Sequence, residues 1–458
     1  MGKYFGTDGV RGAANKDLTA TLAYKIGLSA SDVLLKNIKT NNQKPKIIIG
    51  KDTRISGDMF ESAIAAGICA GGCNAFLIGV APTPAIAYLV KELGFDAGIM
   101  ISASHNHAFD NGIKIFNSQG FKLSDEIEEK IEHAIDNYED IELKTGEFIG
   151  TITKDENFLD KYISHVNAIN KIIDTRYNIK VLIDCANGSA SETAEKIFDG
   201  EKISYSIINS SPDGLNINRK CGSTHLDDII KRMKIGDFDI GFAFDGDADR
   251  CLAIDEKGEI IDGDKIICVL AEDMKQRDKL KNNAIAVTKM SNLGLHKFCE
   301  NRNIIVEQTD VGDRYVLECM LEKDIHIGGE QSGHIIVSDY ATTGDGQITA
   351  VLVLDILRKY KAECKTASEI FGVMKLFPQV SVNVKVENDR KKDIMSNEKV
   401  LEEVEKTTDL LNGNGRVLLR PSGTEPLIRI MIEGENEEII TGYAKNIESV
   451  IKVILGNI

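Results

Sequence analysis

The sequence of 458 residues contains no tryptophan, only seven prolines, and fewer basic than acidic side chains. Its 55 lysines and arginines stand against 71 aspartates and glutamates, which gives a formal net charge of −16. Because such a surface repels phosphate backbones and anionic lipids, we expect neither nucleic acid nor a membrane as a partner. The chain also lacks an apolar run of about 18 residues and an N-terminal signal sequence, so we expect a cytoplasmic protein.

Paired cysteines and several familiar motifs are also absent. The nine cysteines are scattered and none forms a C-x-x-C pair, which excludes a zinc ribbon and a dithiol redox centre and fits a reducing compartment. There is no Walker A loop, G-x-G-x-x-G loop, H-E-x-x-H helix or G-x-S-x-G turn. The sequence therefore gives no support to a nucleotide-cofactor enzyme, a zincin or a serine hydrolase.

Three successive segments alternate between helical and strand periodicity. In the first we predict strands over 47–49, 75–80 and 97–102, and helices over 18–38, 59–70, 85–93 and after Ser124, the predicted N-cap. The pattern restarts near residue 179, with strands over 180–184, 203–208 and 240–244. It restarts again after residue 260, with strands over 284–288 and 304–307 and a helix over 349–360. Helices between apolar strands indicate βαβ units.

The last part of the chain has a different pattern. Valines alternate with other residues over 380–386, a polar helix follows, and strands over 416–419 and 427–432 precede a final helix. This β-α-β-β-α order predicts a small α+β domain. We therefore expect three α/β domains with mixed, largely parallel sheets and a C-terminal α+β domain around a central cleft. The expected boundaries are 1–150, 151–255, 256–370 and 371–458.

Three carboxylates follow the predicted strand over 240–244. Asp245, Asp247 and Asp249 alternate in the sequence D-G-D-A-D-R and can point to one side of an extended loop. They would repel one another without a cation, so we predict a Mg²⁺ site with room for a ligand oxygen on the metal. The alternative, an EF-hand loop, is disfavoured because Arg250 occupies the position that requires glycine and because a strand precedes the loop.

Two other loops carry polar groups suited to binding. Ser104 follows the strand over 97–102, where open α/β sheets bind ligands, although a serine there is often only a turn residue. The glycine-rich loop over 328–334 offers Glu330, Ser332 and His334 to sugar hydroxyls, although such a loop is commonly only a connection.

Basic residues gather in two regions. Near the expected strand ends of the first domain these are Arg11, Arg54 and Lys114. In the C-terminal domain, the segment R-P-S-G-T-E-P and the arginine beyond it fit a phosphate clamp and fit an edge turn with solvated arginines equally well.

Taken together and in this order, these segments resemble the α-D-phosphohexomutase superfamily. The motifs are F-G-T-D-G-V-R-G, S-A-S-H-N, D-G-D-A-D-R, G-G-E-Q-S-G-H and R-P-S-G-T-E-P, and the resemblance extends from Phe5 to Arg429. It implies an isomerase that moves a phosphoryl group within a hexose phosphate by way of a phosphoserine. The first motif, G-G-E-Q-S-G-H and the segment T-T-G-D-G are similar to the amino-sugar branch of the superfamily.

The resemblance gives each candidate residue a role. It implies that Ser104 is phosphorylated and, with Asp245, Asp247 and Asp249, binds one Mg²⁺ ion. It places His105, Lys114, Arg11 and Arg250 around the transferring group, with Lys114 and His105 as candidates for proton handling. It assigns the sugar to Glu330, Ser332 and His334, and the distal phosphate to Arg420, Ser422, Gly423, Thr424 and Arg429. The family usually has proline where this chain has His107, so we expect a less rigid Ser104 loop.

The reaction implied by the resemblance converts glucosamine 6-phosphate into glucosamine 1-phosphate on the route to UDP-N-acetylglucosamine and the cell wall. Glucosamine 1,6-bisphosphate would be the intermediate and activator, and the resemblance also suggests a homodimer. Two alternatives stay open: the same chemistry on mannose or glucose phosphates, and a Mg²⁺-dependent sugar phosphatase. A phosphosugar-binding protein without activity is disfavoured because Ser104 and all three aspartates are intact.

Overall fold

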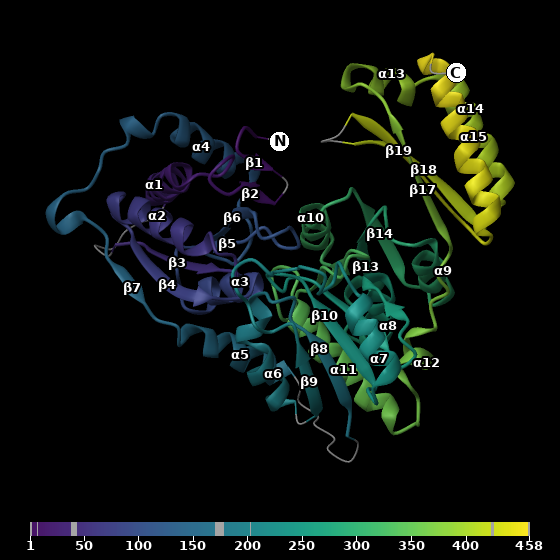
Figure 1. Ribbon diagram of the computed structural model, residues 1–458, viewed down its shortest axis with the longest axis horizontal. Helices are drawn as coiled ribbons and strands as arrows, with labels where there is room; N and C mark the ends of the chain where they lie inside the picture. The colour runs from purple at the N-terminus through teal and green to yellow at the C-terminus, as the bar shows by residue number, and fades with distance from the viewer. Residues whose placement is uncertain are drawn as a thin grey trace. The chain divides into compact units, whose positions relative to one another are not determined.

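The computed structural model describes residues 2–6, 8–37, 44–169, 178–201, 203–422 and 426–456. The chain divides into two compact units (Figure 1). The first comprises Met1–Met290 and Ile304–Val373, and the second comprises Ser291–Asn303 and Met374–Ile458. In the part of the chain described, the first unit holds three sheets and the second holds one.

The first sheet has the strand order β1-β2-β6-β5-β3-β4-β7. Its parallel strands are β3 (Lys46–Lys51), β4 (Asn74–Val80), β5 (Ala97–Ile101) and β7 (Ile152–Lys154). The antiparallel strands β6 (Asp110–Asn117), β2 (Gly9–Ala13) and β1 (Phe5–Gly6) extend it beyond β5. One face packs on α1 (Ala20–Asn37), α2 (Gly57–Ala70) and α4 (Asp125–Asp136), and α3 (Thr83–Glu92) covers the other, where Gly98 leaves room for Val90.

The second and third sheets are also mixed. The second has the order β12-β11-β10-β8-β9, with parallel β8 (Lys180–Asp184), β9 (Ser204–Ile208) and β10 (Ile240–Phe244) and antiparallel β11 (Cys251–Asp255) and β12 (Ile260–Ile261). The third has the order β14-β13-β15-β16, with parallel β13 (Ala284–Thr288), β14 (Ile305–Thr309) and β15 (Ile327–Gly329) and antiparallel β16 (Ile335–Val337). Their helices are α5 (Phe158–Ile169), α6 (Ala194–Gly200), α7 (Asp227–Ile235), α8 (Gly263–Gln276), α10 (Asp313–Lys323), α11 (Gly346–Lys361) and α12 (Ala367–Phe371).

Helix α11 is buried on nearly all sides because it packs against α5, α8 and β11. Asp345 caps its first turn: the carboxylate accepts the Ile348 amide (2.9 Å) and the Tyr162 hydroxyl (2.9 Å). The next amide, that of Gly346, donates to the Ala248 carbonyl (3.0 Å). The N-terminus of α11 therefore supports the loop that carries the three aspartates.

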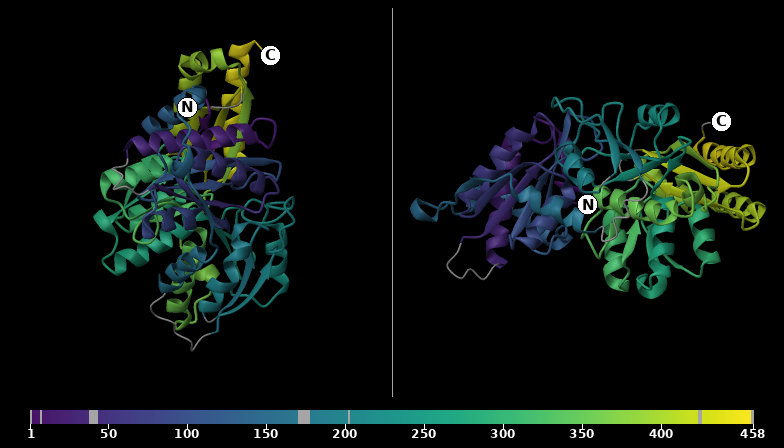
Figure 2. Two further views of the ribbon diagram at one scale, coloured as in Figure 1. Left: turned by 90° about the vertical axis from the view of Figure 1, so that its left-hand side faces the viewer. Right: turned by 90° about the horizontal axis from the view of Figure 1, so that it is seen from below.

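The second unit is a three-stranded antiparallel sheet of order β17-β19-β18, formed by β17 (Gln379–Lys385), β18 (Gly415–Pro421) and β19 (Leu427–Gly434). Figures 1 and 2 show α14 (Glu398–Leu411) and α15 (Glu437–Leu455) side by side on one face of this sheet. Val384, Ile430 and Ile447 lie in the core between them. The unit also includes α9 (Leu293–Asn301) and α13 (Lys391–Met395), and the Asn292 side chain donates to the Phe377 carbonyl (2.9 Å).

The predicted succession of three α/β sheets and a final α+β unit is confirmed. Sequence periodicity missed the antiparallel strands β6, β11 and β16, each of which is short or carries buried polar residues. The predicted helix over 349–360 begins three residues earlier, because Asp345 caps it. The helix after Ser124 is present, but the Ser124 side chain makes no capping hydrogen bond.

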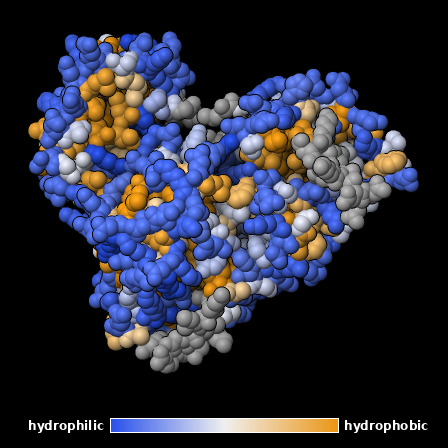
Figure 3. Space-filling view, turned by 180° about the vertical axis from the view of Figure 1, so that it is seen from behind, coloured by the Kyte–Doolittle hydropathy of each residue, from blue (hydrophilic) through white to orange (hydrophobic). Residues whose placement is uncertain are grey.

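Hydrophilic residues predominate on the face shown in Figure 3, and apolar residues form separate patches on it. Within the described ranges, no helix combines the length and the apolar character that crossing a membrane requires.

The pH dependence of protein stability tests the burial of Asp345 at the N-terminus of α11. Burial raises the pKa of Asp345 to about 7, although the Ile348 amide and the Tyr162 hydroxyl favour the charged form. Between about pH 4 and 7 the folded state therefore binds more protons at this site than the unfolded state, so its contribution to stability is lost as pH rises through 7. We expect the unfolding temperature of Asp345→Asn to change less than that of the wild type between about pH 5 and 8.

Asp227→Asn is the matched control, because Asp227 is exposed in the first turn of α7. Its pH profile should follow the wild type. Identical profiles for Asp345→Asn and the wild type would contradict a buried, protonated Asp345.

Candidate active site

Ser104 lies in a loop that is held on several sides. Its φ of 52° is in the left-handed region, which is unusual for a residue with a side chain. The Ser104 amide donates to Ser102 Oγ (2.9 Å), which donates to Asp52 Oδ2 (2.6 Å). The Ser104 carbonyl accepts from Arg54 and Asn218 (both 2.9 Å). These contacts stabilise a strained backbone of the kind that occurs at functional sites.

Arg54 holds the rest of this loop. Its guanidinium also donates to the carbonyls of Asn106 (3.0 Å), His107 and Asp110 (3.0 Å), and its Nε pairs with Asp52 (2.8 Å). Sequence analysis predicted Arg54 only as a source of positive charge. The structure gives it a second role, since one buried guanidinium binds backbone carbonyls of the loop that contains Ser104 and His107.

The Ser104 hydroxyl points at the predicted metal loop. Its Oγ donates to Asp245 Oδ2 (2.6 Å), and the residue is only 1% exposed. His105 Nδ1 lies 3.5 Å from the same Oγ. Burial, together with Arg250 and Arg11, lowers the pKa of His105 to about 4.

Asp245, Asp247 and Asp249 gather at the end of β10. One carboxylate oxygen from each of them lies within 4.8 Å of the other two, and all three residues are buried. Asp247 Oδ1 and Asp249 Oδ1 make no hydrogen bond to any described residue. Burial and the two neighbouring carboxylates raise the pKa of Asp245 well above its usual range. Crowded carboxylates with free buried oxygens are what a hard cation requires, so these residues fit a metal site.

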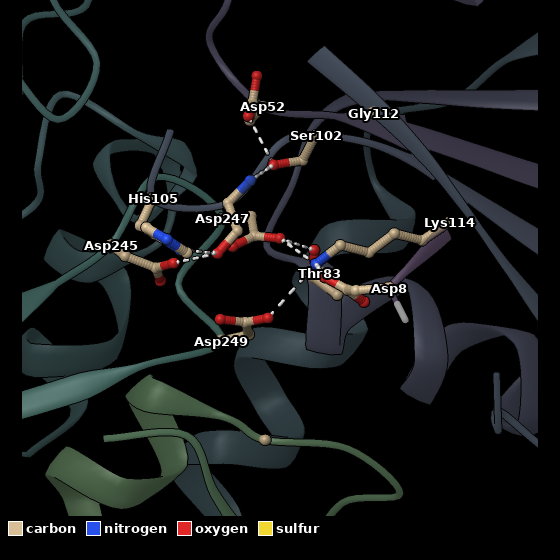
Figure 4. Close-up of polar contacts among 12 residues, drawn as sticks. Asp8, Asp52, Thr83, Ser102, His105, Gly112, Lys114, Asp245, Asp247 and Asp249 are labelled. Atoms are coloured by element: carbon tan, nitrogen blue, oxygen red, sulfur yellow. Dashed lines mark hydrogen bonds and ion pairs between the residues drawn. The ribbon is translucent and has the colours of Figure 1, made fainter. Parts of the chain in front are cut away.

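Positively charged and polar side chains lie next to the three aspartates, and Figure 4 shows Lys114 and Thr83 beside Asp247. Lys114 on β6 is buried, and its Nζ lies 2.9 Å from Asp247 Oδ2 and 3.4 Å from Asp249 Oδ2. The Arg250 amide donates to Asp245 Oδ1 (3.2 Å), and its Nε lies 3.9 Å from Asp249 Oδ1. On the side of α3, the Thr83 hydroxyl donates to Asp247 Oδ2 (2.5 Å).

Three residues that sequence analysis did not select complete the arrangement. Asp8 contacts Arg11, Lys114 (3.2 Å) and Lys122, and Lys122 also contacts Asp313 (2.5 Å). Asp8 lies within the motif F-G-T-D-G-V-R-G, so its position was visible in the sequence. Lys122 and Asp313 lie 191 residues apart along the chain and belong to none of the motifs considered.

His334 lies between two of these carboxylates. Its Nδ1 is 3.6 Å from Asp249 Oδ2, and its Nε2 is 3.6 Å from Asp313 Oδ2. The Gly344 amide donates to Nε2 (3.1 Å). The structure therefore places this residue, predicted to bind the sugar, directly beside the aspartate loop.

The other predicted sugar-binding residues lie on the hairpin of β15 and β16. Ser332 Oγ donates to Glu330 Oε2 (3.3 Å). Gly333 has a φ of 91°, and a Cβ on it would lie 2.4 Å from the Cys251 carbonyl oxygen, so glycine is needed there. The Cys251 amide donates to the Gly333 carbonyl (3.1 Å). This contact fixes the hairpin loop to the residue that follows Arg250.

The predicted phosphate clamp lies in the second unit, and the structure describes some of its residues. Arg420 on β18 and Arg429 on β19 are directly paired in the sheet register. Burial and the neighbouring Arg429 lower the pKa of Arg420. The Ser422 carbonyl accepts Lys391 Nζ (2.6 Å). Gly423 and Thr424 lie outside the described residues. Adjacent guanidinium groups repel each other, so this pair favours an anionic ligand.

Four family models of phosphoglucomutase/phosphomannomutase match the chain in order. They are the α/β/α domains I (residues 2–142), II (160–258) and III (262–377) and the C-terminal domain (382–450). The chain belongs to this phosphohexomutase family, as its motifs indicated.

Individual relatives cover nearly all of the chain. A phosphoglucosamine mutase of Caldicellulosiruptor saccharolyticus is 52% identical over 455 residues, with 99% of each chain covered. One from Clostridium botulinum is 49% identical over 458 residues and covers 99% of this chain and 100% of its own.

Solved structures share the fold. A phosphoglucomutase/phosphomannomutase family protein from Burkholderia thailandensis superimposes with a TM-score of 0.80 at 21% identity, covering 99% of this chain and 98% of its own. The Aspergillus fumigatus N-acetylphosphoglucosamine mutase, in complex with GlcNAc-6P and magnesium, gives a TM-score of 0.70 at 17% identity, covering 98% and 95%.

The contacts of Arg54 predict how the Ser104 loop responds to substitution. Arg54→Lys keeps the positive charge but removes the planar donor group that reaches four carbonyls. We expect amide hydrogen exchange over 103–110 to increase by about tenfold or more, because the loop opens more often.

Arg232→Lys is the control, since Arg232 is exposed on α7 and forms an i,i+4 ion pair with Asp228. It should leave exchange in this loop unchanged. If Arg54→Lys also leaves it unchanged, Arg54 does not hold the loop.

Proposed function

We propose that this chain interconverts glucosamine 6-phosphate and glucosamine 1-phosphate by way of a phosphorylated Ser104. Phosphoglucosamine mutases that are 49–52% identical over almost the whole chain support the substrate. The observation that carries the proposal is the buried Ser104 hydroxyl, 2.6 Å from Asp245 in a group of three carboxylates. A hydroxyl in this place can receive a phosphoryl group next to a cation.

The charges of the site support phosphoryl transfer. Phosphate monoesters are among the slowest compounds to react in water, so an enzyme must align the reacting atoms and neutralise their charge. A phosphoserine carries about −1.5 to −2 charges. Beside Asp245, Asp247 and Asp249 such a group would be repelled unless a cation lay between them.

Asp245, Asp247 and Asp249 would hold Mg²⁺, with a phosphate oxygen on Ser104 as a further ligand. When bound, the ion would neutralise negative charge on the transferring group. The free oxygens of Asp247 and Asp249 support this assignment, because they are buried and otherwise unsatisfied. Lys114 and Arg250 add positive charge next to the carboxylates.

The proposed reaction has two transfers. In the first, the bond from phosphorus to Ser104 Oγ breaks, a bond to O1 of glucosamine 6-phosphate forms, and the O1 proton passes to a base. His105, 3.5 Å from Ser104 Oγ, is the candidate for this base. Lys114, which is paired with Asp247 and Asp249, is a cation and is therefore a candidate to donate a proton. The 1,6-bisphosphate then reverses its orientation. In the second transfer, a bond from Ser104 Oγ to the phosphorus of the 6-phosphate forms and the bond from that phosphorus to O6 breaks. The proton taken from O1 passes to O6, and glucosamine 1-phosphate leaves.

Two further groups of residues would hold the substrate. Glu330, Ser332 and His334 would bind sugar hydroxyls, and Arg420, Ser422, Gly423, Thr424 and Arg429 would bind the phosphate that is not reacting. The register pairing of Arg420 with Arg429, which brings two positive charges close together, supports the second assignment. A grip on the distal phosphate suits a mutase, because the bisphosphate must stay bound between the two transfers.

Substrate preference tests the proposal. We expect the phosphorylated enzyme, with Mg²⁺, to convert glucosamine 6-phosphate at least about tenfold more efficiently than glucose or mannose 6-phosphate, measured as kcat/KM. Ser104→Ala should lose at least about 10³-fold in rate, because no residue remains to carry the phosphoryl group. Ser118→Ala, at an exposed turn, is the matched control.

A preference for glucose or mannose phosphate would overturn the proposed substrate. Release of inorganic phosphate without a 1-phosphate product would indicate a phosphatase. Full activity in Ser104→Ala would contradict a phosphoserine at this position.

Metal binding is tested without turnover. Titration calorimetry with Mg²⁺ or Mn²⁺ should give one site per chain, and Asp247→Asn should weaken it by about tenfold or more, because one ligand charge is lost. Asp227→Asn, which removes an exposed carboxylate, should leave the affinity unchanged. Equal affinities in the wild type and Asp247→Asn would show that the metal binds elsewhere.

A further inference from the structure

One carboxylate, that of Asp8, contacts three cationic side chains. Its Oδ2 accepts from Arg11 and lies 3.2 Å from Lys114 Nζ, and its Oδ1 accepts from Lys122. About a fifth of the Asp8 side chain is exposed. Within the described part of the chain, Asp8 is the only hydrogen-bond partner of the Arg11 side chain, whose buried Nε has none.

The backbone around Asp8 is built to approach Lys114 closely. Gly9, the next residue, has a φ of 75°. A Cβ on Gly9 would lie 2.4 Å from the Ile113 carbonyl oxygen and 3.2 Å from the Lys114 Cα atom, so another residue could not occupy this position without displacing the strand. The turn that carries Asp8 therefore rests directly on β6 at Lys114.

Without Asp8 the three cations would repel one another. Burial alone would raise the pKa of Asp8, but Lys114, Lys122 and Arg11 hold it well below its usual range. The carboxylate is therefore charged, and its attraction keeps Arg11 and Lys114 on the same side of the site.

Asp8 also connects the site to the third sheet. Lys122 extends from Asp8 to Asp313, and Asp313 lies 3.6 Å from His334, which lies 3.6 Å from Asp249. Lys114 returns from Asp8 to Asp249 (3.4 Å). Asp8 thus belongs to a closed ring of alternating acidic and basic side chains, consisting of Asp8, Lys122, Asp313, His334, Asp249 and Lys114.

We propose that Asp8 is a positioning residue for phosphoryl transfer, which holds Arg11 and Lys114 in the orientation that the transferring group requires. This inference rests on the proposed function, because it assigns Arg11 and Lys114 to that group. Asp8 does not itself bind the sugar phosphate, since an anion would repel another anion. Its loss should therefore affect the transfer step more than substrate binding.

The test compares three variants of the full chain with Mg²⁺ and a bisphosphate activator: Asp8→Asn, Asp8→Glu and the control Asp17→Asn. Asp17 is exposed and, among the residues that the structure describes, accepts only the Ala13 amide, so its substitution removes the same charge from the same segment. We expect Asp8→Asn to lower kcat by about 10²-fold while KM changes by less than about threefold. Asp8→Glu should recover about tenfold of the lost kcat, because the charge is restored one methylene farther away. Asp17→Asn should match the wild type.

A mutant cycle with Lys114→Met separates positioning from a general structural effect. If Asp8 acts through Lys114, the loss caused by Asp8→Asn should be much smaller in the Lys114→Met background than in the wild type. Equal losses in both backgrounds would overturn the proposal. So would an unchanged kcat in Asp8→Asn, a loss confined to KM, or a lowered unfolding temperature that Asp8→Glu does not restore.

A failure of the proposed function would be seen in the activity of the wild type. If the wild type does not convert glucosamine 6-phosphate, the proposed substrate is wrong, and the variants are compared on whichever hexose phosphate the wild type converts. Failure of the inference about Asp8 would be seen only in the ratio of variant to wild type.

Discussion

The candidate active site depends on a balance of negative and positive charges among buried side chains. Asp245, Asp247 and Asp249 lie at the end of one strand with little access to water, and two of their oxygens accept no hydrogen bond from the described residues. Isolated buried charges are costly, so such a group persists only where cations and hydrogen-bond donors surround it. Lys114, Arg250 and Thr83 provide part of this environment, and the metal would complete it.

Each of the three sheets of the first unit contributes polar or charged side chains to the candidate active site. The first sheet brings Ser104 at the end of β5 and Lys114 on β6, and the second brings the aspartates after β10. The third brings His334, on the hairpin between β15 and β16. Helix α11 then supports the aspartate loop through the Gly346 amide. The fold thus positions opposite charges from distant parts of the sequence within hydrogen-bonding distance.

Much of the fold could be predicted from the sequence because the parallel strands are short apolar runs. Strands β8, β10 and β13 begin and end at the residues that periodicity indicated. Strand β6 was missed because it contains Asn111, Gly112 and the buried Lys114, which are atypical of a strand in a core. Its polar residues are there for the site, so local sequence preference is a poor guide to this strand.

The site was predictable where its residues are adjacent in sequence and not where they meet across the fold. The aspartate loop is one hexapeptide, and its grouping follows from its spacing. Arg54 was expected to supply charge, but its four contacts to loop carbonyls depend on backbone positions that no motif specifies. Lys122 and Asp313 were missed because their contact joins segments 191 residues apart.

The proposed mechanism requires Ser104 to carry the transferred phosphoryl group. The most direct measurement incubates the protein with Mg²⁺ and isotopically labelled glucose or glucosamine 1,6-bisphosphate, digests it, and locates the labelled phosphate by mass spectrometry. We expect one label per chain, on Ser104, which is removed when excess hexose 6-phosphate is added. A label on another residue, or a protein that isomerises the sugar phosphate without becoming labelled, would contradict it.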